Sequence, residues 1–251
     1  MKRLLIIIAA ALALTSCIAI NVAVETGNGV PVTTDITVGD FDALSIPSSI
    51  DVIYTQTPGQ QSLTFTCDQN LQEYYDIRVE NKVLVVSTKR GVVAITPRVK
   101  TFLVVNSPVL NSVKISGSGD CEINSPIVAK GDFSLSISGS GDINLNGQAD
   151  CKAFSATTSG SGDIAVIAVA SQTAEVRSSG SGDIGIDAIK AGDITAKTTG
   201  SGDIVLVCDG AGDIEASTSG SGSIVLSGTA HSLGQRSSGS GRVDARNLFL
   251  N

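Results

Sequence analysis

Short stretches in the second half of the chain alternate apolar and polar residues, the pattern of strands with one buried face. One apolar row begins directly after a recurring Gly-Ser-Gly-Asp segment, and a second row lies two positions further on. The rows are Ile143, Ile164, Ile184, Ile204, Ile224 and Val243, and then Leu145, Val166, Ile186, Leu206, Leu226 and Ala245. Because the period is two and the stretches are short, the pattern predicts strands and not helices.

The segment that precedes these strands recurs at near-constant spacing. It reads SGSGD in its first four copies, then TGSGD, SGSGS and SGSGR. Its copies end at Asp120, Asp142, Asp163, Asp183, Asp203, Ser223 and Arg242, at intervals of 22, 21, 20, 20, 20 and 19 residues. Self-similarity at such a period indicates a solenoid, in which each repeat forms one coil.

A second turn signal lies about half a period from the first, at Gly131-Asp132, Gly192-Asp193 and Gly212-Asp213. Each unit is therefore expected to contain two turns, each followed by a short strand. One unit cannot bury an apolar face alone, but stacked units align identical residues ~4.8 Å apart into a continuous core. The sequence predicts an all-β fold, a parallel β-helix (solenoid) with coils of about 20 residues.

The turn residues have structural roles in such a fold. Glycine supplies either a positive φ or room for close backbone approach. Aspartate at a turn accepts hydrogen bonds from nearby backbone N–H groups, and serine columns can hydrogen-bond along the stack. The polar residues Arg242, Asp244, Arg246 and Asn247 fall in the last coil, where they predict a terminal cap.

The region from Phe41 to Ile115 is less regular. Strand-like runs are separated by turn signals such as Pro58-Gly59 and Ser107-Pro108. The runs are residues 50–54, 63–67, 76–79, 83–87 and 102–105. No linker with a different composition divides the two halves, so these runs are predicted to form wider coils of the same body. Residues 38–251 are thus expected to be one β-solenoid domain.

The N-terminus has the pattern of a bacterial lipoprotein signal peptide. Lys2 and Arg3 precede the apolar run from Leu4 to Leu14, which is shorter than the ~20 residues of a membrane-spanning helix. The run ends in Leu14-Thr15-Ser16-Cys17, which resembles a lipobox. Residues 1–16 are therefore predicted to be a signal peptide, Cys17 the lipid attachment site, and residues 17–37 a lipidated tether with a first strand. Acyl chains then provide the membrane contact.

The amino-acid composition indicates how the core is built and which classes of partner the protein can bind. Aromatic residues make up 4% of the chain and Trp is absent, so the core must consist of Ile, Val, Leu and Ala. The formal net charge is −7 and Lys and Arg form no cluster, which argues against nucleic acid as a partner.

The sequence contains no group of residues that indicates a catalytic site. The single histidine, His231, would have to be oriented by an acid and paired with a nucleophile, yet the serines are turn residues at repeat spacing. Carboxylates at Asp142, Asp163, Asp183 and Asp203 would form a column, whereas a glycosidase needs one pair with different environments and a sugar-sized groove. No catalytic residue and no cofactor is predicted.

Calcium is the main alternative for the aspartate column. The motif superficially resembles the calcium-binding nonapeptide repeat, but its period is near 20 residues and its last copy places Arg242 at the aspartate position. A turn held by hydrogen bonds without a specific metal is therefore expected. The register also places Cys121, Cys151 and Cys208 at different phases of the repeat, so no disulfide is predicted among them.

The order of these features resembles a known family. The lipobox is followed by Val38-Gly39-Asp40-Phe41-Asp42-Ala43-Leu44, a strand pair around residues 77–86, Val113-Lys114-Ile115 and the SGSGDI ladder. Over roughly residues 38–245 the chain resembles the head GIN domain family of "putative autotransporter adhesins", which are bacterial lipoproteins without a known function. The resemblance implies a right-handed β-helix and export from the cytoplasm, and it brings no catalytic residues.

Together these features predict a non-enzymatic, lipid-anchored cell-envelope protein that acts as a structural or adhesion module. Its expected location is the outer membrane, because Ile18 is not the aspartate that retains some lipoproteins in the inner membrane. The expected partners are the membrane, through the lipid anchor, and a glycan or an envelope protein. The alternative function is a carbohydrate-active enzyme, either a polysaccharide lyase or a hydrolase, on the same scaffold.

Overall fold

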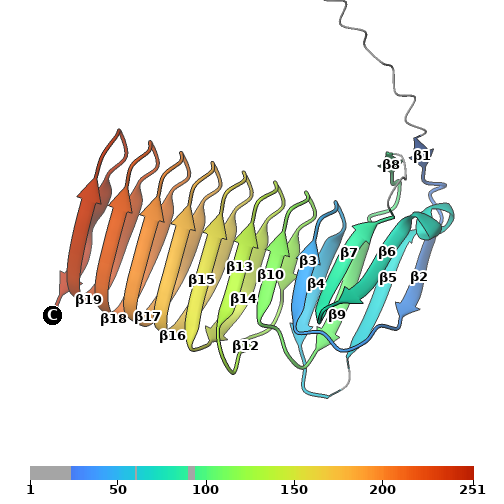
Figure 1. The fold of residues 1–251 in the computed structure, drawn as a ribbon, viewed down its shortest axis with the longest axis horizontal. Helices are drawn as coiled ribbons and strands as arrows, with labels where there is room; N and C mark the ends of the chain where they lie inside the picture. The colour runs from blue at the N-terminus through green and yellow to red at the C-terminus, as the bar shows by residue number, and fades with distance from the viewer. Residues whose placement is uncertain (1–23, 60, 90–93) are drawn as a thin grey trace, which may run out of the picture.

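The computed structural model describes residues 24–251 except residues 60 and 90–93, and it is a β-solenoid (Figure 1). The described chain starts beside β1 (Glu25–Thr26) at one end of the solenoid, and β20 (Val243–Leu250) lies at the other end. The predicted all-β solenoid is confirmed, and neighbouring coils pair 19 to 22 residues apart, as in Ile184 with Ile204.

Two groups of strands, called face A and face B, are defined here by their place in the coil. Face A carries the strand that follows the motif, and face B carries the second strand of the coil. Face A contains β4 (Asp51–Gln56), β11 (Cys121–Ile123), β12 (Ile127–Val128), β14 (Ile143–Asp150), the first parts of β16 (Ile164–Ser178), β17 (Ile184–Thr198), β18 (Ile204–Thr218) and β19 (Ile224–Ser237), and β20. Face B contains β3 (Ala43–Ile46), β10 (Ser112–Ile115), β13 (Phe133–Ile137), β15 (Ala153–Thr158) and the second parts of β16 to β19.

The apolar rows lie in parallel register, as expected. On face A, Ile143, Ile164, Ile184, Ile204 and Ile224 follow one another from coil to coil. These side chains are at most 1% exposed, and the inward residues of face B belong to the same core cluster. The sequence departs from the row at Cys121, which is buried in the isoleucine position between Val52 and Ile143.

The prediction of two separate short strands per coil is wrong for the last complete coils. β16, β17 and β18 are each 15 residues long and continue through the half-period Gly-Asp position. The coils are in close contact there, since a Cβ on Gly212 would lie 1.7 Å from the carbonyl oxygen of Gly192, and the register between β17 and β18 shifts between Ile189 and Asp193. The half-period glycine thus marks a bend within a strand.

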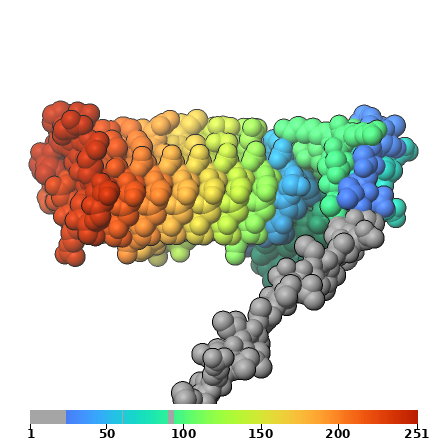
Figure 2. All heavy atoms as spheres, turned by 90° about the horizontal axis from the view of Figure 1, so that it is seen from above, coloured from blue at the N-terminus to red at the C-terminus, as the bar shows by residue number. Residues whose placement is uncertain are grey.

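The N-terminal half is only partly coiled. β3 and β4 form one parallel coil that lies between β10 and β11 on one side and β7 (Val83–Thr88) and β9 (Phe102–Ser107) on the other. In Figure 2 this light-blue coil separates two green segments that are distant from it in the chain. Spatial order therefore departs from sequence order at this point.

The outer strands of this half are antiparallel, which corrects the prediction of wider coils. β5 (Ser62–Asp68) pairs antiparallel with β9 and with β2 (Pro31–Ile36), and β6 (Tyr75–Glu80) pairs antiparallel with β7. The short 3-10 helix η1 (Gln69–Tyr74) joins β5 to β6, and β8 (Ile95–Thr96) pairs with β1. β2 extends the folded sheet into the range that was assigned to the tether.

The motif glycines are required by close stacking. A Cβ on Gly182 would lie 2.0 Å from the carbonyl oxygen of Gly162 in the preceding coil, and Gly160, Gly180, Gly200 and Gly202 are equally tight. Among the motif glycines only Gly239 has a positive φ, at 93°. The repeated glycine therefore provides space for the neighbouring backbone.

Candidate interaction surfaces

The aspartate column forms one continuous hydrogen-bonded row along the turns. In each coil the aspartate Oδ1 accepts a hydrogen bond from the backbone N–H of the equivalent residue in the next coil. The bonds run from Asp142 to Asp120 (2.9 Å), Asp163 to Asp142 (2.8 Å), Asp183 to Asp163 (2.7 Å), Asp203 to Asp183 (2.7 Å) and Ser223 to Asp203 (2.6 Å). Asp51 begins the row by accepting from Asp120.

This row of hydrogen bonds explains why the motif recurs at regular spacing along the chain. Backbone donors satisfy one carboxylate oxygen per coil, although they come from the adjacent coil and not from within the turn as expected. In the described parts of the chain, no three His, Cys, Asp or Glu side chains are grouped so that they could hold a metal ion. Ser223 ends the row because it lacks a carboxylate that could accept from the last turn.

A second polar column, which the sequence analysis missed, lies inside the turns. The buried hydroxyls of Thr158, Ser178, Thr198 and Thr218 donate to the carbonyl oxygens of Gly162, Gly182, Gly202 and Gly222 at 2.7–2.9 Å. Each bond spans the Gly-Ser-Gly turn from the strand before it to the last glycine. The recurring Ser or Thr two residues before the first glycine was the available signal.

The single histidine forms an exposed polar cluster on face B. His231 Nδ1 lies 2.8 Å from Asp213 Oδ1, and the Ser232 hydroxyl donates to the same oxygen at 2.7 Å. The hydrogen bond from His231, followed by that from Ser232, lowers the pKa of Asp213. Because Ser232 bonds to the acid and not to the imidazole, the order of groups differs from that of a hydrolytic triad.

Face B also carries a hollow in its middle coils, which is lined by both polar and apolar residues. It has a volume of about 510 Å³, and its lining includes the hydroxyls of Ser134, Ser155 and Thr195 and the carboxylates of Asp132 and Asp193. Hydroxyl and carboxylate groups in rows suit hydrogen-bonding ligands such as sugars. The aromatic rings beneath, Phe133 and Phe154, are buried and so offer no exposed platform.

Face A presents apolar side chains to the solvent over its later coils. Ile167, Val205, Val207 and Val225 are 37–50% exposed. Val205 pairs with Val225 in adjacent coils, so these two side chains are neighbours, whereas Gly185 occupies the equivalent position in the preceding coil. Exposed apolar groups on such a surface are a feature of interaction sites.

The four cysteines of the solenoid are free thiols that lie at different positions in the fold. Burial raises the pKa of Cys121 to about 12, and burial raises the pKa values of Cys151 and Cys208 to about 11. Cys208 pairs in register with Ile189 and Gly228 and so lies far from the coil of Cys121. These thiols are poor nucleophiles at neutral pH, since the thiolate is the reactive form.

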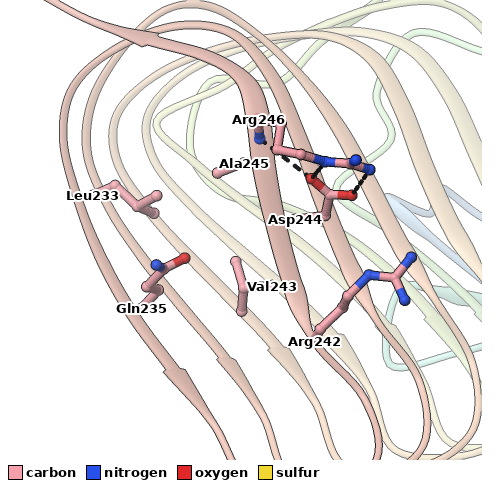
Figure 3. Close-up of a pocket in the computed structure, with 7 residues that line it drawn as sticks. All are labelled: Leu233, Gln235, Arg242, Val243, Asp244, Ala245 and Arg246. Carbon is pink, nitrogen blue, oxygen red and sulfur yellow. Dashed lines mark hydrogen bonds and ion pairs between the residues drawn. The ribbon is translucent and has the colours of Figure 1, made fainter.

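The polar residues Arg242, Asp244 and Arg246 lie in or beside β20, in the last coil of the solenoid. Asp244 and Arg246 form an ion pair at 2.6 Å on the outer side, and the bonds from Arg246 lower the pKa of Asp244 to about 2 (Figure 3). A hollow of about 600 Å³ at this end has both polar and apolar lining residues, which are Leu233, Gln235, Arg242, Val243, Asp244, Ala245 and Arg246.

The last coil also differs in sequence charge from the rest of the chain. Residues 216–251 contain Arg236, Arg242 and Arg246 but only one acidic side chain, Asp244, whereas the whole chain has a formal net charge of −7. The acidic row along the turns stops at Asp203, and Arg242 occupies its position in the last coil. Two acidic side chains of the preceding coil also reach this end, since Asp213 bonds to Ser232 and the Glu215 carboxylate lies against Gly234. Basic and acidic groups therefore lie side by side in the last coil.

The coils stack in register, and the turn carboxylates accept hydrogen bonds from the backbone. These features are those of a solenoid with a structural or binding role. The chain belongs to the family described as "Putative auto-transporter adhesin, head GIN domain", whose model matches residues 40–210 and 166–251. The resemblance inferred from the sequence is thereby confirmed. No protein with a curated description matches the chain.

Solved structures share this fold. A putative adhesin from Bacteroides fragilis is 23% identical with a TM-score of 0.78, and the alignment covers 87% of this chain and 98% of that one. A putative adhesin from Parabacteroides distasonis is 23% identical with a TM-score of 0.75, covering 88% and 99%. A structure from the same species described as a putative lipid binding protein is 23% identical with a TM-score of 0.71, covering 88% and 99%.

The predicted lipid attachment site, Cys17, lies outside the described residues. Within the part of the chain that the structure describes, no helix is long and apolar enough to cross a membrane.

Proposed function

We propose that this protein is a non-enzymatic adhesion or interaction module of the bacterial cell envelope, held in the outer membrane by lipid on Cys17. The observation that carries the proposal is the placement of the two ends of the described chain. The described chain starts at one end of a long solenoid, and its last coil lies at the opposite end (Figure 1). A lipid on the N-terminal side would leave the far end free to meet a partner.

The family supports an adhesion-like role at the cell envelope. The lateral surfaces fit that role because they are long, regular and made of hydroxyl, carboxylate and small apolar side chains. The partner classes we propose are a glycan, bound by the hydroxyl and carboxylate groups of the hollow on face B, or an envelope protein. Membrane contact through acyl chains is strong, since each buried methylene contributes about 0.8 kcal/mol.

Replacement of the lipidated cysteine tests the anchor. We expect Cys17→Ala to prevent processing or to release the protein from the membrane fraction, because the acyl chains are the proposed membrane contact. Cell fractionation and the mass of the mature protein measure both effects. Cys151→Ala is the matched control, since it removes a half-buried cysteine of the solenoid and leaves the lipobox intact. Normal maturation and membrane retention of Cys17→Ala would contradict the proposal.

A further inference from the structure

Two arginine–glutamate pairs lie on the outward side of the sheet of face B. β7 pairs with β3 and β6 pairs with β7, so these two strands extend face B at its N-terminal side. Arg78 and Glu80 come from β6, and Arg177 and Glu175 come from the second part of β16. In each pair the arginine Nε donates to the Oε1 of a glutamate two residues away on the same strand. Both arginine side chains are partly exposed, by 37% and 43%.

Although they are far apart in the chain, the two pairs occupy the same two rows of face B. The strands lie in the order β6, β7, β3, β10, β13, β15 and β16 (Figure 1), and their register places Arg78 and Arg177 in one row, the arginine row, and Glu80 and Glu175 in the next, the glutamate row. Between the pairs, most row positions carry partly exposed hydroxyl side chains, which are Ser45, Ser112, Ser134, Ser136, Ser155 and Thr157. The two pairs are six strand spacings apart, or about 29 Å at ~4.8 Å per spacing.

The pair in β6 lines a hollow of about 660 Å³. Nε of Arg78 donates to Glu80 Oε1 at 2.7 Å, and Nη1 donates to Asp76 Oδ2 at 2.5 Å and to Ser87 Oγ at 3.1 Å. A guanidinium has five N–H donors, so the two on Nη2 remain, and they have no partner among the described residues. The guanidinium is therefore fixed between two carboxylates, and acceptor, donor and acceptor groups follow one another along the strand before any ligand binds.

The pair in β16 lies at the other hollow of face B, which has a volume of about 510 Å³. Glu175 lines this hollow together with Ser134 and Ser155 of the glutamate row. Each pair is thus placed at a hollow, and hydroxyl groups occupy most of the rows between the two pairs.

The charges along these strands are balanced. The face-B strands from β6 to β17, taken from Thr173 in β16 and from Asp193 in β17, contain four cationic and four anionic side chains. These are Arg78, Lys114, Arg177 and Lys197, and Asp76, Glu80, Glu175 and Asp193. The whole chain, in contrast, has a formal net charge of −7. An ionic ligand would meet both signs of charge, so this surface favours an uncharged ligand whose groups both donate and accept hydrogen bonds.

We propose that face B binds a linear, uncharged polysaccharide, which lies along the solenoid axis over the arginine and glutamate rows and reaches from the hollow at β6 to the hollow at β16. The direction follows from the two pairs, because the rows that join them cross the strands. Sugar hydroxyls can donate to the carboxylates of Glu80 and Glu175 and accept from Arg78 and the row hydroxyls. This inference rests on the proposed function, in which a glycan occupies the second hollow, and extends that ligand to a polymer.

Hydrogen bonds, and not stacking on aromatic rings, supply the contact. Phe133 and Phe154 are buried, and the positions of the two rows between the pairs contain no aromatic residue. Each sugar is therefore held weakly, and affinity grows with the number of sugars bound at once. A protein partner is a poorer match, because the centres of protein interfaces are depleted in charge and enriched in aromatic side chains and Met.

Binding of neutral oligosaccharides of increasing length tests the inference. The purified full-length protein is titrated calorimetrically with disaccharides, tetrasaccharides and hexasaccharides of glucose, mannose, galactose and xylose. At least one hexasaccharide should bind at least about tenfold more tightly than its own disaccharide, because only the longer chain reaches both hollows. Hexasaccharides of galacturonic acid and of glucosamine carry a single sign of charge and should bind at least about tenfold more weakly than the neutral one.

Matched variants locate the site. Arg78→Gln and Arg177→Gln each remove one charge from one end of the rows and keep a polar side chain. Each should weaken binding of the hexasaccharide by about fivefold or more and reduce its advantage over the disaccharide. Arg246→Gln is the control and should leave binding unchanged, because Arg246 forms the same kind of pair with Asp244, two residues away, but on β20 of face A. Thermal unfolding checks that the three variants are equally folded.

The results separate the possibilities. Length-dependent binding of a neutral hexasaccharide that both Arg78→Gln and Arg177→Gln weaken, and that Arg246→Gln does not, supports the inference. No binding of any neutral hexasaccharide, tighter binding of a charged one, or an equal effect of all three variants overturns it. Binding that only Arg177→Gln weakens also overturns it, because the glycan is then confined to the second hollow, but it leaves the proposed function standing. The membrane anchor is tested separately by Cys17→Ala.

Discussion

At the scale of single residues, the solenoid is held by columns in which each side chain contacts its own equivalent. Ile204 lies in register between Ile184 and Ile224 and is fully buried, whereas its neighbour Val205 is 43% exposed. The alternation of inward and outward positions thus decides how much each residue contributes to stability, since only inward side chains lose contact with water.

Alanine substitutions at adjacent inward and outward positions are predicted to have very different effects on the free energy of unfolding. Ile204→Ala should leave a cavity and lower the free energy of unfolding by about 2–5 kcal/mol. Val205→Ala is the control and should cost well under that, because its side chain is half exposed. Urea unfolding monitored by circular dichroism measures both. Equal and small effects would show that the inward and outward faces have been assigned wrongly.

Asp68 is the buried carboxylate that joins the N-terminal segments. It is 0% exposed, and it accepts bonds from the backbone N–H groups of Gly29 (2.7 Å), Arg98 (2.9 Å) and Val99 (2.9 Å). Burial disfavours its charged form, but the three backbone donors and the nearby Arg98 outweigh burial and lower its pKa. The ionised carboxylate therefore stabilises the fold.

The lowered pKa of Asp68 predicts a defined pH dependence. Its stabilisation is fully present above the unfolded pKa of about 3.9 and is lost as the pH falls through the lower folded pKa. Asp68→Asn cannot accept from all three donors and should be less stable at neutral pH. Urea unfolding across this range should show the difference between the two proteins shrinking as the pH falls. A constant difference would contradict the assigned role.

At the scale of elements, the turn between faces B and A is determined by contact between neighbouring backbones. The glycines leave room for the carbonyl of the preceding coil, a buried hydroxyl such as that of Thr198 crosses the turn, and the aspartate bonds to the next coil. Each of these three contacts restricts the spacing of successive coils, and this explains why the motif recurs so regularly.

Two glycines of the same coil provide a matched test of this geometry. Gly182→Ala places a Cβ 2.0 Å from a backbone oxygen that cannot move independently, so it should strongly destabilise or prevent folding. Gly185→Ala meets nothing within 4 Å and has no positive φ, so it should be neutral or stabilising, by up to about 1 kcal/mol. Thermal unfolding compares the two variants. Similar midpoints would show that the coils are not as closely stacked.

At the scale of the whole molecule, the acidic row raises the question of how stacked carboxylates are stabilised. Like charges ~5 Å apart repel by about 1 kcal/mol even in water. Backbone N–H groups offset this by bonding to one oxygen of each carboxylate from Asp120 to Asp203. The other oxygen remains a single ligand per coil, which is far from the six to eight oxygens that calcium prefers.

Calcium is therefore expected to leave the stability unchanged. The midpoint of thermal unfolding should be the same in chelator and in millimolar calcium at fixed ionic strength, because backbone donors already satisfy the row. Magnesium at the same concentration is the control for general screening of charge. A midpoint that rises by many degrees with calcium but not with magnesium would assign the row to specific metal sites instead.

The sequence by itself determined the solenoid, its coil length and the inward rows, because identical coils repeat the same alternation and a slip of one residue would expose the whole core. It also located the turns, since glycine and aspartate recur there at fixed spacing. The long strands β16 to β18 were not predictable, because only contact with the adjacent coil shows that Gly212 bends the strand without ending it.

Only the tertiary structure decided the two ends. The antiparallel pairing of β2, β5, β6 and β9 depends on partners far apart in the chain, and local alternation is the same in parallel and antiparallel strands. The polar pattern around Asp244 predicted polar residues in the last coil, but only the structure shows that these residues line a hollow together with Leu233 and Val243. Edges of a sheet are defined by which strands are absent beside them, and no local sequence pattern records that.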